Sequence, residues 1–91
     1  MITIDLTGKL AVITGASGQL GRVMAATLAK AGADIAVHYH KNREQAEKLV
    51  CELRKIGMKA ESFTADIGDL SEVLTMRDAI FSRMGRPDIV V

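Results

Sequence analysis

The order of the predicted secondary structure constrains the fold more than any other feature of this chain. Short apolar runs at residues 10–14, 35–39 and 60–65 have the length of buried strands, and a fourth begins at Ile89. Between them lie three longer segments with apolar residues at helical spacing. Such alternation implies parallel strands with right-handed crossovers. We therefore expect a three-layer α/β fold, the N-terminal half of a doubly wound parallel sheet with strand order 3-2-1-4.

Capping residues mark the ends of the predicted helices. Asn42 followed by Gln45, and Asp69 followed by Glu72, each match a capping box at a helix N-terminus. The run at 60–65 is more polar than the first two, which suits a strand at the edge of the sheet. Glycines stand where the helices should end, at Gly32, Gly57 and Gly85. The apolar pattern predicts a core that includes Ile13, Leu28, Ala36, Leu49, Leu53 and Phe81.

A glycine-rich turn at residues 14–21 joins the first strand to the first helix. The free N–H groups and the dipole of a helix N-terminus favour an anion such as a pyrophosphate. Gly15 would permit the tight turn, Gly18 the close approach to phosphate, and Gly21 the close packing of helix on strand. These features predict a Rossmann-like dinucleotide site, whereas the alternative is a glycine-rich turn without a ligand. The residues of the turn after Thr14 are Gly15, Ala16, Ser17, Gly18, Gln19, Leu20 and Gly21.

The end of the second strand should contact the ribose, about 20 residues after the glycine turn. Tyr39 stands there, where an NAD site would have a carboxylate, and His40, Lys41 and Arg43 follow. Cationic side chains at this place favour a 2′-phosphate and hence NADP(H). The alternative is a solvated basic loop that precedes a helix.

Asp66 and Ile67 follow the third strand. At the carboxyl edge of the sheet, a carboxylate could accept a hydrogen bond from the adenine amino group, or Asp66 could simply help to begin the next helix. His38 and His40 would share one strand face, but no third ligand is spaced for a metal. We therefore expect no metal site and two ordinary surface histidines.

Composition excludes several classes of function. The net charge is +1, which gives no electrostatic signal for nucleic acid or for a membrane surface. The lone Cys51 cannot form an internal disulfide. Because no apolar run is long enough for a membrane helix and no leader stands at the start of the chain, we expect a cytoplasmic location.

Taken together, these motifs resemble those of the short-chain dehydrogenase/reductase family, and most closely its 3-oxoacyl-(acyl-carrier-protein) reductases of fatty acid synthesis. The glycine turn instead matches the Thr-Gly-x-x-Gly-x-x-Gly pattern of the extended branch, with Gln19 at the usual middle-glycine position. The segments that carry the resemblance are residues 6–9, 14–17, 32–34, 65–67 and 85–91.

The resemblance implies that residues 15–21 contact the pyrophosphate of NADP(H). It also implies that Ser17, His40 and Lys41 lie near the 2′-phosphate, and Asp66 and Ile67 near the adenine. The family's Asn-Asn-Ala-Gly segment, catalytic serine and Tyr-x-x-x-Lys pair do not occur in this sequence. We therefore assign no catalytic residue and expect the chain alone to be inactive.

The sequence thus predicts that residues 1–91 form an NADP-binding half-domain, cut at the start of the fourth strand. The expected whole protein is an NADPH-dependent carbonyl reductase that acts on a small molecule or a 3-oxoacyl thioester and forms a homo-oligomer. An alternative is a non-catalytic NADP-binding sensor or interaction module. A further one is a remnant of a split or proteolysed gene product.

Overall fold

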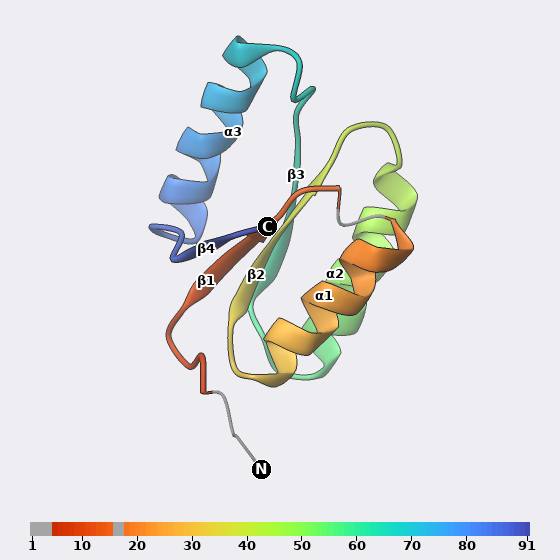
Figure 1. Cartoon of the computed structure of the whole chain (residues 1–91), viewed down its shortest axis with the longest axis vertical. Helices are drawn as coiled ribbons and strands as arrows, with labels where there is room; N and C mark the ends of the chain where they lie inside the picture. The colour runs from red at the N-terminus through yellow and green to blue at the C-terminus, as the bar shows by residue number, and fades with distance from the viewer. Residues whose placement is uncertain (1–4, 16–17) are drawn as a thin grey trace.

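The computed structural model describes residues 5–15 and 18–91, which form one parallel sheet between two helical layers (Figure 1). The strands are β1 (Leu10–Ile13), β2 (Asp34–Tyr39), β3 (Ala60–Thr64) and β4 (Ile89–Val90). The helices are α1 (Gln19–Lys30), α2 (Arg43–Lys55) and α3 (Leu70–Arg83). The strand order is β3-β2-β1-β4 and every pairing is parallel, which confirms the predicted topology and the edge position of β3.

Alternate residues of the strands face the two helical layers. Ala11 and Ile13 of β1 join the core under α1 and α2, whereas Leu10 and Val12 join the core under α3. The same period of two runs through β2, because strand side chains point alternately to opposite faces. The sheet therefore has two apolar faces, and helices cover both (Figure 1).

The helices pack through different kinds of side chain. Ala25 and Ala29 of α1 are buried, and such small residues let the helix backbone approach the sheet. The larger Leu49, Val50 and Leu53 of α2 fill the space beside them.

Two of the predicted core residues differ from expectation. Ile13, Ala36, Leu49 and Leu53 are buried, but Leu28 is only partly buried and Phe81 is 47% exposed. The prediction for Phe81 was wrong because its neighbour Ile80 faces the sheet, and one residue along a helix turns the side chain about 100° away.

The predicted caps hold two helix N-termini. The Asn42 side chain accepts the Gln45 N–H at 3.4 Å, and that of Asp69 accepts the Ser71 N–H at 2.9 Å. Within the described residues, no helix is both long enough and apolar enough to cross a membrane.

Candidate cofactor site

The carboxyl ends of β1, β2 and β3 surround one open pocket of about 530 Å³. Parallel strands end at the same edge of a sheet, so loops that are far apart in the sequence meet there. The pocket is lined by Thr14, Gly15, His38, His40, Lys41, Asn42, Asp66 and Ile67. The structure thus brings together the start of the glycine turn, the basic loop after β2 and the segment after β3. The predicted contacts Gly18, Gln19, Leu20 and Gly21 are not among the lining residues.

The two described glycines of the turn that precede α1 differ in backbone conformation. Gly15 has a φ of +63°, in the left-handed region that favours glycine. Gly18 has an ordinary φ of −76°, but a Cβ there would lie 3.4 Å from the Gly15 carbonyl oxygen. Gly15 is therefore suited to the turn itself, whereas Gly18 keeps the start of α1 free of side-chain atoms.

The N-terminus of α1, which follows the turn, has unpaired backbone N–H groups and the positive end of the helix dipole. No acidic residue lies in its first turn, and its N-cap Gly18 has no side chain to occupy the free N–H groups. Gln19 and Leu20 begin the helix and are exposed, and Gly21 is half-buried. Ala16 and Ser17, which the sequence also predicts as contacts, lie outside the described residues.

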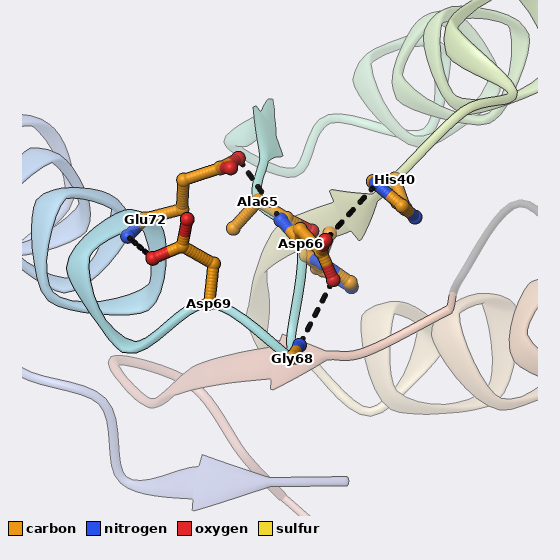
Figure 2. Close-up of polar contacts among 7 residues, drawn as sticks. His40, Ala65, Asp66, Gly68, Asp69 and Glu72 are labelled. Carbon is orange, nitrogen blue, oxygen red and sulfur yellow. Dashed lines mark hydrogen bonds and ion pairs between the residues drawn. The ribbon is translucent and has the colours of Figure 1, made fainter.

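Asp66 is held in place by three polar contacts after β3 (Figure 2). Its N–H donates to Glu72 Oε1 at 3.1 Å, and its Oδ1 accepts the Gly68 N–H at 2.9 Å. Its Oδ2 lies 4.0 Å from His40 Nε2, across the mouth of the site. Asp69 is the N-cap of α3, so the side chain of Asp66 closes the turn before the helix and does not cap it. The predicted return contact of Glu72 within a capping box is wrong, since its carboxylate bonds Asp66 instead.

The residues after β2 divide between the pocket and its surroundings. His40 and Lys41 are exposed and line the pocket, whereas Tyr39 packs against the core under α1 and α2. Arg43 points its Nε to Glu47 Oε1 at 3.1 Å, and this contact raises the pKa of the Arg43 guanidinium. His40 and Lys41 are therefore the basic side chains best placed toward a ligand in this pocket.

His38 is the main residue that sequence reasoning missed. It is 3% exposed, so the prediction of a surface histidine was wrong. Its Nδ1 lies 3.0 Å from the Gly15 nitrogen and its Nε2 lies 2.9 Å from the Ala65 carbonyl oxygen. His38 lies inside the continuous apolar run at residues 35–39, and this position was the signal in the sequence that its side chain is buried. Among residues 5–15 and 18–91, no group of three or more histidine, cysteine, aspartate or glutamate side chains is placed to hold a metal.

Comparison with known proteins identifies the family. Residues 9–91 match the family model for short chain dehydrogenase. Versicolorin reductase of Emericella nidulans is 40% identical over 85 residues, which are 93% of this chain and 32% of that protein. The chain thus spans about a third of the length of the curated relatives that it matches.

Solved structures have the same fold. A dehydrogenase from Burkholderia cenocepacia with bound NADP superposes with a TM-score of 0.89 at 32% identity, over 99% of this chain and 35% of that one. A D-mannonate oxidoreductase from Haemophilus influenza with bound NAD gives a TM-score of 0.89 at 33% identity, over 96% of this chain and 31% of that one. The chain therefore belongs to the short-chain dehydrogenase/reductase family and holds the N-terminal half of its fold.

Proposed function

We propose that this chain binds NADP(H) at the carboxyl edge of its sheet, as the cofactor-binding part of an NADPH-dependent carbonyl reductase. The observation that carries the proposal is the single pocket shared by Gly15, His40, Lys41 and Asp66. The free N–H groups of α1 suit the pyrophosphate, and the pocket end beside Asp66 and Ile67 suits the adenine. The bound nicotinamide would supply hydride chemistry to the whole protein.

The preference for NADP over NAD rests on His40 and Lys41. Both side chains are exposed beside the pocket, and the segment 39–43 contains no carboxylate that could accept the two ribose hydroxyls. Arg43 contributes less, because Glu47 already accepts a hydrogen bond from it. Charge-assisted contacts are worth about 1.5–3 kcal/mol when well formed, and solvent and salt weaken exposed ones. We expect a total preference in that same range, roughly ten- to a hundredfold in affinity.

The test is a titration of the chain with NADP⁺ and NAD⁺ at fixed ionic strength. His40→Ala combined with Lys41→Ala should move the affinity ratio toward one, because it removes both basic side chains that line the pocket. Lys48→Ala removes an exposed lysine of α2 outside this pocket, and it should leave the ratio unchanged. Equal affinities of the unmodified chain for NADP⁺ and NAD⁺ would refute the assignment of NADP preference to His40 and Lys41. A preference unaffected by the double substitution would place specificity at Ser17 and the glycine turn.

The reduction itself is proposed for the whole protein and not for residues 1–91 alone. Tyr39 is the only tyrosine of the sequence, and it packs against the core away from the pocket lining. The purified chain should therefore oxidise no NADPH with an acetoacetyl thioester. Turnover that co-purifies with the chain would refute this assignment.

For the whole protein we propose two alternative substrate classes. The sequence motifs favour a 3-oxoacyl thioester, whereas the similarity to versicolorin reductase favours a compound like versicolorin. A longer protein that contains residues 1–91 should be assayed with both kinds. The higher kcat/KM identifies the class.

A further inference from the structure

We propose that His38 is a positioning residue for the cofactor site, whose buried imidazole holds the glycine turn at a set distance from the segment after β3. This inference rests on the proposed function for its consequence in cofactor binding. The tautomer of His38 and its hydrogen bond to Gly15 can both be tested without any cofactor.

The ring of His38 joins the ends of three neighbouring strands. It lies in β2, one residue before the strand ends, and its side chain is buried. Gly15 follows β1 and lies 3.0 Å from Nδ1, while Ala65 follows β3 and lies 2.9 Å from Nε2. One side chain thus spans from the pyrophosphate side of the pocket to the adenine side.

Both contacts can form in only one protonation state of the ring. The backbone N–H of Gly15 can only donate, so Nδ1 must be free of a proton. The carbonyl of Ala65 can only accept, so Nε2 must carry one. His38 is therefore the neutral Nε2–H tautomer, because an imidazolium or the opposite tautomer would set a second N–H against that of Gly15.

The bond to Gly15 is linked to the start of α1 by a second hydrogen bond. The carbonyl of Gly15 accepts the Gly18 N–H at 3.1 Å, and Gly18 is the N-cap of α1. On the other side, Ala65 directly precedes Asp66, whose own N–H is held by Glu72. A shift of the ring would therefore move the free N–H groups of α1 relative to Asp66, and one dinucleotide could no longer contact both well.

Two substitutions separate the two bonds of the ring. In asparagine the amide oxygen is bonded to Cγ, as Nδ1 is in histidine. His38→Asn therefore keeps an acceptor for the Gly15 N–H. In glutamine the amide nitrogen lies one carbon further from the backbone, at a position similar to that of Nε2. His38→Gln therefore keeps a donor for the Ala65 carbonyl and loses the acceptor for the Gly15 N–H. The variants differ by one methylene, so a purely structural role would give similar changes in both.

The first measurement needs no cofactor. Amide hydrogen exchange of Gly15 should be slow in the unmodified chain and in His38→Asn, and at least tenfold faster in His38→Gln. His40→Asn, at an exposed histidine whose side chain lies near Asp66, should leave Gly15 exchange unchanged. Imidazole ¹⁵N spectra of the unmodified chain should show a proton on Nε2 and none on Nδ1.

The second measurement is the dissociation constant for NADP⁺. It should rise about tenfold or more in His38→Gln and less than about threefold in His38→Asn, a difference expected from one lost buried hydrogen bond. If both variants lose the same affinity for NADP⁺, in step with a fall in their melting temperatures, the positioning role of His38 is overturned. A proton on Nδ1 in the unmodified chain would overturn it even if neither variant folds. If the chain binds no nucleotide but shows the predicted tautomer and exchange, the proposed function fails and the structural role of His38 stands.

Discussion

Replacing Gly32 by alanine should destabilise the chain through two separate effects. Gly32 follows the C-cap of α1 and has a φ of +106°, which a residue with a Cβ rarely adopts. A Cβ there would also lie 2.9 Å from Thr7 Oγ1, 3.0 Å from the Thr7 nitrogen and 3.2 Å from its Cα. Two of these atoms belong to the backbone, so a side-chain rotation cannot relieve all three contacts.

Thr7 is itself held against movement. Its hydroxyl donates to Asp5 Oδ1 at 2.6 Å, and its N–H donates to the same oxygen at 3.0 Å. The preceding Leu6 N–H donates to the carbonyl of Ala31, next to Gly32, at 2.6 Å. The segment therefore cannot move away from a new methyl group without the loss of at least one hydrogen bond.

Gly85 provides a matched control for the magnitude. It also follows a helix C-cap, its φ is +102°, and a Cβ there would meet nothing within 4 Å. Backbone strain of this kind costs of order 1–3 kcal/mol, so Gly85→Ala should lose about that much. Gly32→Ala should lose about 1–3 kcal/mol more, the usual cost of overpacking.

Urea unfolding followed by circular dichroism measures the free energy of unfolding of each variant. Thr7→Ala in the Gly32→Ala background should recover only part of the difference, because it removes the hydroxyl and leaves the two backbone contacts. If Gly32→Ala and Gly85→Ala lose the same free energy, the contact with Thr7 does not constrain this junction and the reasoning is wrong.

Three further predictions concern the core, a helix cap and acid stability. Leu49→Ala should lose about 2–5 kcal/mol of unfolding free energy, whereas Leu20→Ala, at a side chain 75% exposed, should change it by less than about 0.5 kcal/mol in the same urea assay. Asp69→Ala should cost about 1 kcal/mol, because it leaves the Ser71 N–H without its cap, and Ser71→Ala should cost less. Hydrogen bonds from the Thr7 hydroxyl and N–H lower the pKa of Asp5 in the folded chain, so its contribution is present at neutral pH and is lost on acidification below about pH 4. Asp5→Asn should therefore flatten the acid side of a plot of melting temperature against pH, and an unchanged slope would contradict the assignment.

The topology and most helix ends follow from local features of the sequence. The alternation of strand and helix patterns, with short connections, was sufficient for the order β3-β2-β1-β4. Asn42 and Asp69 were sufficient for the starts of α2 and α3. These features could be predicted because periodicity and capping depend on residues within a few positions of one another.

The sequence also predicted in part which segments meet at the candidate site. Once the strands are parallel, the segments after β1, β2 and β3 must meet at one edge, and the pocket there contains Gly15, His40 and Asp66. The exact partners of the side chains were not predictable in this way.

Contacts across the sheet were decided only by the tertiary structure. The burial of His38 depends on its two partners, which lie 23 and 27 residues away in the sequence. Glu72 bonds Asp66 and not its own N-cap, because the turn after β3 brings the Asp66 N–H within reach. The exposure of Phe81 depends on which face of α3 meets the sheet. A local pattern specifies that a helix or strand forms, but strand register and the rotation of a helix on the sheet determine which distant polar atoms meet.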